Sequence, residues 1–148
     1  MAFEDRRVIN GTYGEMWLDS EEMGEVFGLN AKFKLNTQEV SQCKRFMTGE
    51  KVIGGKGEGT VKLHKVTSRM AKLLAQCIKN KQFPVFTIIS NLEDPDSFGA
   101  EKVKVTGVLF NELTLIDWEA GKVGEESYPF TFTSFEFIDS IDTKVNFE

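Results

Sequence analysis

Residues 60–80 read TVKLHKVTSRMAKLLAQCIKN, and the spacing of their apolar side chains changes partway along. Val61 and Leu63 alternate with polar neighbours, a period of two that is typical of a strand with one buried face. From Met70 onward the apolar residues recur at i, i+3, i+4, i+7 and i+8, the stripe of an amphipathic helix. The spacing therefore predicts a strand over residues 60–65 that leads into a helix over about residues 68–79.

The ends of this helix have their own signals. Thr67 or Ser68 is a suitable N-cap, because a short hydroxyl side chain can accept a hydrogen bond from a free N–H of the first turn. Asn80 is expected to be the left-handed residue that ends the helix. Cys77 lies on the apolar stripe, where a free thiol behaves as a small hydrophobic group.

The segment before this stretch predicts a hairpin. Residues 12–18 are expected to form its first strand, residues 19–22 its turn and residues 23–35 its second strand. The second strand alternates between one parity expected in the core and one expected in water. The first parity comprises Leu29, Ala31, Phe33 and Leu35, and the second Asn30, Lys32 and Lys34.

Three apolar segments follow the helix. Residues 83–89 and 101–110 predict strands, with a turn at Asp94-Pro95-Asp96 between them and with residues 111–118 continuing the second strand after a bend. Within the second strand Val103 and Val105 are expected to face inward and Lys102 and Lys104 outward.

After a turn over residues 121–124, residues 128–137 predict a closing strand rich in phenylalanine. Phe130 and Phe132 have the opposite parity to Phe135 and Phe137, which a bulge near Thr133-Ser134 would reconcile. Many short antiparallel strands and a single helix predict a mainly β fold of the α+β kind. We expect an antiparallel β-sandwich or barrel packed by one α-helix, as a single domain over residues 1–148.

A glycine-rich segment interrupts this pattern. Gly54, Gly55, Gly57 and Gly59 crowd the end of residues 37–59, and closely spaced glycines weaken a strand because each loses much backbone entropy on folding. We expect a long Gly-rich hairpin loop over about residues 40–59. Two interpretations stay open, a mobile hairpin that does something and a decorated surface loop.

Composition excludes several classes of protein. The net charge of −5 and the pI near 5.1 argue against general affinity for a phosphate backbone. Cys43 and Cys77 are too few for a disulfide framework or a zinc site. The N-terminal residues lack an apolar signal core, and no window has the length of a membrane span, so we expect no membrane anchor and assembly in the cytoplasm.

Residues with catalytic chemistry are sparse. His64 is the single histidine, on the polar parity of a strand, and a metal site or a general base needs converging partners. The glycines at 54–59 precede a strand rather than a helix, unlike a phosphate-binding loop. The acidic pairs Glu21-Glu22 and Glu125-Glu126 are expected in turns, as solvated charges. We therefore predict no catalytic, cofactor-binding or metal-binding residue and no enzymatic activity.

Several stretches resemble the tail tube proteins of contractile phages, of the PBSX prophage type. They are INGTYGEMWLD at residues 9–19, LHKVTSRMAKLL at 63–74, FPVFT at 83–87 and YPFTFT at 128–133, and with the order of elements the likeness covers nearly the whole chain. The resemblance implies a structural subunit of hexameric rings that stack into the inner tube of a tail. Such a tube surrounds a tape-measure protein, lies within a contractile sheath, starts on a baseplate and later conducts DNA without binding it specifically. The subunit would thus pass from the host cytoplasm into the tail of a virion or phage-like particle.

Within that interpretation, residues 42–57 are the first candidate for the contact between rings, and an N-terminal arm, at residues 2–10 within 1–11, is the second. A net acidic chain suits a lumen that must not hold DNA, because like charges repel. Lysines of outward parity could instead face a lumen or a sheath; they are Lys32, Lys34, Lys62, Lys102 and Lys104.

Several different classes of protein stay open at this point. A small-molecule-binding β-barrel would also be rich in strands and aromatic residues, and would be a monomer with an apolar internal cavity. A tube subunit similar to those of type VI secretion systems and a baseplate module would both share the mainly β fold. An enzyme would need a site that only the folded chain assembles.

Overall fold

The computed structural model describes residues 2–97 and 99–141. Met1 of the predicted arm and residues 142–148 of the predicted domain lie outside the described residues. The fold is mainly antiparallel β with one α-helix, as expected. Its elements are the short 3-10 helices Asp5–Arg7 and Gly11–Tyr13, the strands β1 (Gly14–Leu18), β2 (Glu21–Glu22), β3 (Val26–Val40), β4 (Gly49–His64), β5 (Phe86–Leu92), β6 (Glu101–Phe110), β7 (Glu125–Phe132) and β8 (Ser134–Asp139), and the helix α1 (Arg69–Asn80).

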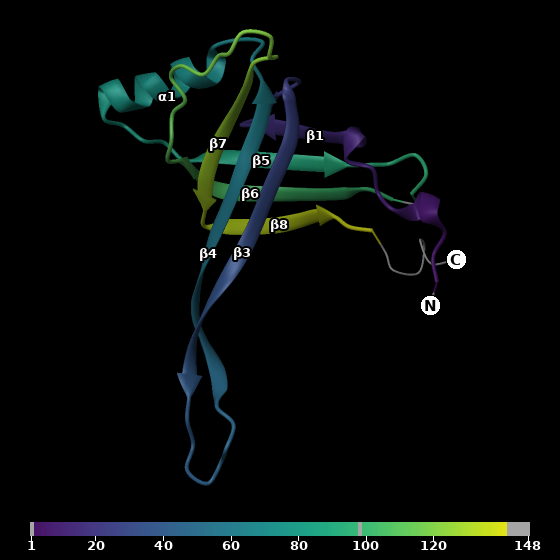
Figure 1. The fold of residues 1–148 in the computed structure, drawn as a ribbon, viewed down its shortest axis with the longest axis vertical. Coiled ribbons are helices and arrows are strands. Elements are labelled where there is room, and N and C mark those ends of the chain that lie inside the picture. Colours follow the sequence, from purple (N-terminus) through teal and green to yellow (C-terminus); the bar gives the residue numbers. More distant parts are fainter. Residues whose placement is uncertain (1, 98, 142–148) are drawn as a thin grey trace.

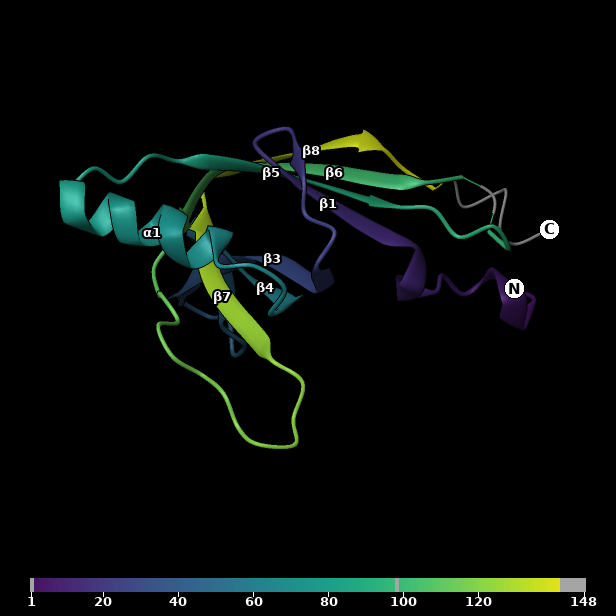
Figure 2. The ribbon, with the colours of Figure 1, turned by 90° about the horizontal axis from the view of Figure 1, so that it is seen from above.

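The strands form two layers that share β6. Their order is β2-β1-β5-β6-β7-β4-β3, and β8 pairs with β6 off this path. In Figure 1 β1, β5, β6 and β8 run across the view, while β3, β4 and β7 cross them steeply, and Figure 2 shows the two layers from above. Crossed layers of this kind make a sandwich whose corners need strands that pass from one layer to the other.

One corner lies where β6 passes from one layer to the other and where β7 is followed by β8 in the opposite layer. β6 pairs with β5 and β8 along most of its length, but its last residues, Leu109 and Phe110, pair with β7. At the bend Gly107 has a φ of +69°, and a Cβ there would overlap the Thr133 hydroxyl. Thr133 N donates to Thr106 O at 3.2 Å, and β7 ends beside it. The single closing strand predicted over residues 128–137, with a bulge near Thr133-Ser134, is therefore wrong: the chain breaks there into β7 and β8, which pair in different layers, and this break explains the two parities of phenylalanine.

The core fills the space between the layers. Val61, Tyr128 and Phe130 are almost completely buried, and Val61 and Leu63 face inward as predicted. Aromatic rings pack against one another in a row through this core. Their centroids are 5.6 Å apart for Phe86–Phe110 and 5.9 Å apart for Phe110–Phe130. These spacings are those of favourable aromatic pairs. An apolar core filled in this way positions both layers rigidly.

The helix is confirmed over Arg69–Asn80, with Met70 and Leu74 in the core. Ser68 occupies the N-cap position without a side-chain hydrogen bond, whereas Thr67 Oγ1 accepts from Arg69 N at 3.4 Å. The prediction for Asn80 is wrong by one residue. Lys81 has the left-handed conformation, with φ 54°, because the helix continues through Asn80 before its chain turns.

The predicted hairpin between residues 12–18 and 23–35 is wrong. β1 pairs with β2 and β5, with Trp17 opposite Ile89, whereas β3 pairs with β4. The turn at Asp19-Ser20 leads only into the two-residue β2, and the chain then passes to the other layer. Pairing with a strand some seventy residues away depends on the layers' packing and leaves no local signal.

Two further predictions need correction. Residues 111–118 do not extend β6, and the whole connection 111–124 has no strand. The glycine-rich segment is not a loop, because β4 runs through it from Gly49 to His64, leaving only residues 41–48 as the connection to β3. Its glycines make room for aromatic rings, since a Cβ at Gly55, Gly57 or Gly59 would overlap a phenylalanine ring. These rings belong to Phe33, Phe132 and Phe130, respectively.

Candidate assembly surfaces

His64, the single histidine, takes part in packing. Its ring stacks on Phe27 with centroids 4.4 Å apart, at the exposed end of β4. Across residues 2–97 and 99–141, no group of three or more His, Cys, Asp or Glu side chains is placed to hold a metal ion. In the same ranges no helix is long and apolar enough to cross a membrane. The features of the described residues that point to a function are exposed apolar surfaces and a free strand edge.

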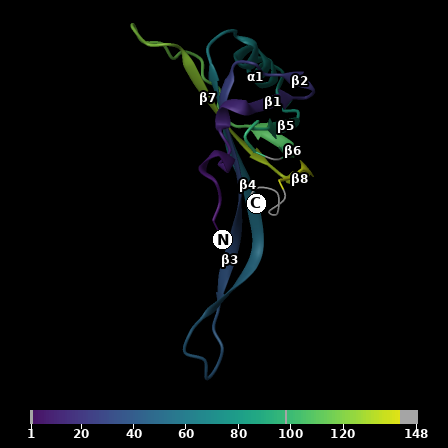
Figure 3. The same ribbon diagram turned by 90° about the vertical axis from the view of Figure 1, so that its right-hand side faces the viewer.

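The largest is an arm made by β3 and β4. β4 pairs with β7 from Gly57 to His64, but its residues 49–56 pair with β3 alone. Residues 34–56 therefore leave the sandwich as a two-stranded ribbon, here called the arm, which Figures 1 and 3 show reaching away from the body along the long axis. Seven residue pairs hold this ribbon together, which at about 3.3 Å per residue gives a length of about 23 Å. A two-stranded hairpin is marginal in water on its own, so the arm is suited to being covered.

The arm also overturns the predicted core face of residues 29–35. Leu29 is partly buried against the core, but Phe33 is 43% and Leu35 55% exposed. The ring of Phe33 still packs against Phe132 and Phe135, but from Leu35 onward the apolar parity of β3 continues onto a surface without a facing layer in the described residues.

The end of the arm is apolar and basic. Residues 41–53 are here called the tip, and within them Phe46 is fully exposed and Met47 is 75% exposed. Lys44 and Arg45 stand beside them in the connection, and Cys43 is exposed. Large apolar side chains gathered on an exposed surface are typical of an interaction site.

The opposite end of the molecule carries a second exposed apolar group. The connection 111–124 between β6 and β7, here called the upper loop, lies at that end, and Figure 3 shows it reaching outward beyond β7, away from α1 (Figures 1 and 3). Four of its large apolar side chains are between 76% and 81% exposed. They are Leu115, Ile116, Trp118 and Val123.

A third surface is the edge of the layer that contains β1, β5 and β6. β8 pairs with β6 on one side and with no other strand of the described residues. Phe135 and Phe137 lie on its core-facing side, opposite Val105 and Val103, yet both are about half exposed. Phe33 of β3, just before the arm, lies 5.8 Å from Phe135, centroid to centroid. An unpaired strand edge with apolar side chains is a template for pairing with another chain.

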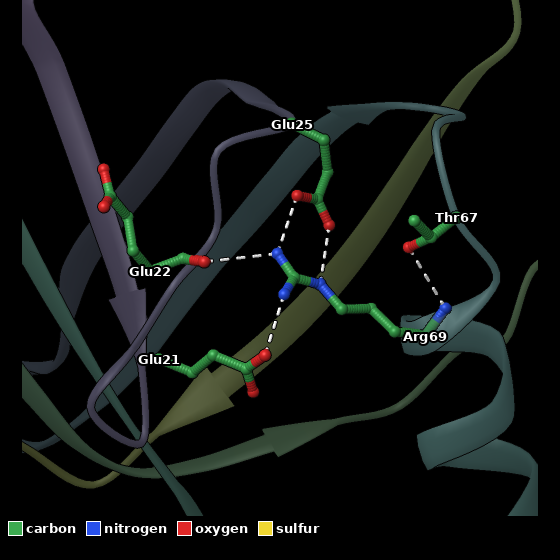
Figure 4. A network of polar contacts seen from close by, with 5 residues as sticks. All are labelled: Glu21, Glu22, Glu25, Thr67 and Arg69. Atoms are coloured by element: carbon green, nitrogen blue, oxygen red, sulfur yellow. Dashed lines mark hydrogen bonds and ion pairs between the residues drawn. The ribbon is translucent and has the colours of Figure 1, made fainter.

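Beside these surfaces, a charged cluster ties α1 to the β2–β3 connection (Figure 4). Arg69 donates from Nε and Nη2 to both Glu25 oxygens, at 2.8 and 2.7 Å, and from Nη1 to Glu21 at 2.9 Å. Partial burial raises the pKa of Glu25, but the hydrogen bonds and the charge of Arg69, together with a backbone hydrogen bond, outweigh it, and the net pKa lies below its ordinary value. The turn predicted for Glu21 is wrong, because Glu21 is a residue of β2; its side chain is 70% exposed, as predicted, but it also binds a distant arginine.

A second ionic contact lies at the start of β7. Glu126 is only 5% exposed, contrary to the predicted solvated turn, and binds Lys65 Nζ while accepting from the Tyr128 hydroxyl. Burial and the carboxylate of Glu126 raise the pKa of Tyr128. Lys65 N also donates to Gly124 O at 2.8 Å, so this contact anchors one end of the upper loop.

The predicted N-terminal arm lies against the β5–β6 connection. Arg7 Nη1 donates to Asp96 O, and Asn10 N donates to Asp94 Oδ2, both at 2.8 Å.

Of the lysines predicted to face outward, Lys32, Lys34 and Lys62 are exposed, whereas Lys102 Nζ lies 5.9 Å from the centroid of the Trp17 ring. Sequence reasoning missed the upper loop, although its sequence LTLIDW contains four large apolar residues in an irregular pattern; Leu113 packs against the core, and the other three are exposed.

Comparisons with known proteins agree with this architecture. Residues 1–139 match the model of a family described as phage tail tube protein. The PBSX phage-like element protein XkdM of Bacillus subtilis strain 168 is 34% identical over 138 residues, which cover 92% of this chain and 94% of that protein. Among solved structures, one of the tube-terminating cap of the anti-feeding prophage has a TM-score of 0.74, covering 95% of each chain at 10% identity. One of the sheath–tube complex of an extracellular contractile injection system has a TM-score of 0.68 at 10% identity, covering 90% of this chain and 92% of that one. At such identity the solved structures support the fold, and the family match together with XkdM shows that this chain belongs to the phage tail tube protein family.

Proposed function

We propose that this tail tube protein closes into hexameric rings through its sheet edges, and that the rings stack through the arm into the inner tube of a contractile tail. The observation that carries this proposal is the arm, a two-stranded ribbon whose apolar side chains have no covering layer within the described residues. A subunit that functioned alone would pay for that exposure with a tendency to aggregate.

Ring closure is supported by β8. Its free edge and its half-exposed Phe135 and Phe137 suit pairing with a neighbouring copy. A head-to-tail contact between different surfaces closes into a ring when its rotation divides a full turn. The number six comes from the family resemblance rather than from the geometry of one chain.

The partners follow from the same interpretation. The finished tube would surround a tape-measure protein, contact a sheath on its outer face, begin on a baseplate and conduct DNA without specific binding. The subunit would be made in the bacterial cytoplasm and reside in the tail of the particle. Its role would be structural rather than enzymatic, and no cofactor would be needed.

Family membership favours this proposal over the small-molecule-binding barrel and the type VI tube. The barrel interpretation expected an apolar internal cavity, but the space between the layers is filled by side chains such as Tyr128 and Phe130. A surface hollow beside β1 and β5 is lined largely by polar residues, among them Thr12, Glu15, Glu93 and Asp94.

The experiment is to shorten the arm and look for tubes. Val40 and Gly49 are paired directly, so residues 41–48 can be replaced by Asn-Gly, which forms the tight turn that such a pair accepts. We expect a variant with an unchanged circular dichroism spectrum that yields rings or monomers but no long tubes in negative-stain electron microscopy.

Two single substitutions make a matched control. Phe46→Ser removes a fully exposed aromatic ring from the tip, whereas Phe83→Ser removes one that is 59% exposed before β5. Tubes should be lost with Phe46→Ser and kept with Phe83→Ser. Normal tubes from the shortened arm would overturn the proposal.

A further inference from the structure

The tip and the upper loop are two exposed apolar surfaces at opposite ends of one molecule. We propose that the tip of one copy, residues 41–53, seats on the upper loop, residues 111–124, of the next copy along the stack. This inference rests on the proposed stacking and names the surface that receives the arm.

The apolar parts match in kind. The tip presents Phe46 and Met47 with Val52 and Ile53, each at least half exposed, and the upper loop presents Trp118 among three aliphatic side chains. Exposed clusters of this size are unusual on a protein that stays single. Burying the two against each other would remove both from water in one contact.

The charges are complementary. The tip contains Lys44, Arg45 and Lys51 with one acidic residue, Glu50, which makes a net charge of +2. The upper loop contains three acidic residues and one lysine, which makes a net charge of −2. Its Lys122 is already paired with Glu119 at 3.0 Å, so Glu112 and Asp117, both exposed, are the charges left for a partner. Opposite net charges across a contact fix its orientation and exclude wrong pairings.

The position of the two surfaces decides between modes of contact. A tip-to-tip contact would be symmetric, would stop at two copies and would bring positive charges together. A contact between opposite ends can repeat along the axis, which a growing tube requires. The hollow near Glu93 and Asp94 is also acidic, but it is largely polar and lies on the flank, so it does not match the apolar part of the tip.

The test uses Cys43, which is already exposed in the tip. In a Cys77→Ala background, Leu115→Cys places a second thiol in the upper loop, and assembled protein is treated with a short bismaleimide. We expect a ladder of covalent multimers on a denaturing gel, which disappears when Cys43 is also replaced by Ala. Glu93→Cys in the same background serves as the matched control for the flank and should give no ladder.

The outcomes separate this inference from the proposed function. Tubes in the microscope without a ladder from Leu115→Cys, or with a ladder from Glu93→Cys instead, would overturn the inference and leave the stacking proposal standing. If the unmodified protein formed neither rings nor tubes, and the Leu115→Cys variant gave no ladder, both the inference and the proposed function would be overturned.

A charge exchange gives a second readout. Glu112→Lys with Asp117→Lys should abolish tube growth, as should Lys44→Glu with Arg45→Glu, because each places like charges in contact. Combining all four substitutions should restore tubes. Unchanged growth in both double variants would contradict the assignment.

Discussion

Gly59 gives the sharpest test of how the arm joins the body. A Cβ at this position would lie closer than 3.0 Å to both Asn30 O and the Phe130 ring, a separation that real Cβ atoms essentially never show. Asn30 O is a backbone atom of the paired strand β3, and Phe130 is only 2% exposed. Neither group can move without disturbing the sheet or the core.

The expected cost of Gly59→Ala follows from these neighbours. Adding a methyl group to a well-packed site typically costs about 1–3 kcal/mol. Since both obstacles are fixed here, we expect the upper part of this range, about 2–3 kcal/mol. For a domain of this size that corresponds to a fall in melting temperature of about 6–9 °C.

Gly54 is the matched control, because it lies in the same strand and nothing would stand within 4 Å of its added Cβ. Gly54→Ala reduces only the freedom of the unfolded chain and should be neutral or stabilising by up to about 1 kcal/mol. Urea denaturation followed by tryptophan fluorescence measures both variants, at a protein concentration where the chain is monomeric. Equal losses of stability in the two variants would refute the close-approach argument.

Three further substitutions test single contacts. Lys81→Gly should raise stability by up to about 1 kcal/mol in thermal denaturation, because glycine adopts the left-handed conformation at φ 54° without strain; a loss would contradict this interpretation of the helix end. Glu25→Gln should cost roughly 1 kcal/mol at pH 7, since Arg69 is partly solvated. Because the folded pKa of Glu25 is lowered, its contribution to stability is present above the unfolded pKa and is lost as the pH falls through the folded pKa. The stabilities of the two proteins in urea should therefore converge once the pH lies below the folded pKa, and a gap that stays constant with pH would count against the pair. Tyr128→Phe should cost about 1–3 kcal/mol by leaving Glu126 with one partner fewer. The folded pKa of Tyr128 is raised, so the native chain should lose stability as the pH rises past about 10, and the variant should show a flatter alkaline profile.

The exposed apolar surfaces also explain why a strand pattern can mislead. Alternation over residues 29–35 predicted one core face, and the same alternation continues on a ribbon outside the body. A period of two records only that one face of a strand avoids water. It does not say whether that face is covered by the same chain or by another copy, which is why the core prediction for Phe33 and Leu35 is wrong.

Local physics was sufficient for several elements. The helix at Arg69–Asn80, the strand at Glu101–Phe110 and the inward parity of Val61 and Leu63 follow from spacing alone, because side-chain direction is set by the backbone period. The irregularity at residues 133–134 was also predictable, since two parities of phenylalanine cannot share one face of an uninterrupted strand.

Tertiary structure decided the rest. Glycines that weaken a strand by composition became an ordered part of β4, because rings from β3 and β7 occupy the space that their side chains would have filled. The partner of β1, the burial of Glu126 and the placement of the tip and the upper loop at opposite ends all depend on contacts between residues far apart in the chain. The sequence by itself therefore determined the helix, several of the strands and the resemblance to the family. Which faces are left for other copies was decided only when the two layers crossed, since burial is a property of the packed chain and not of any one segment.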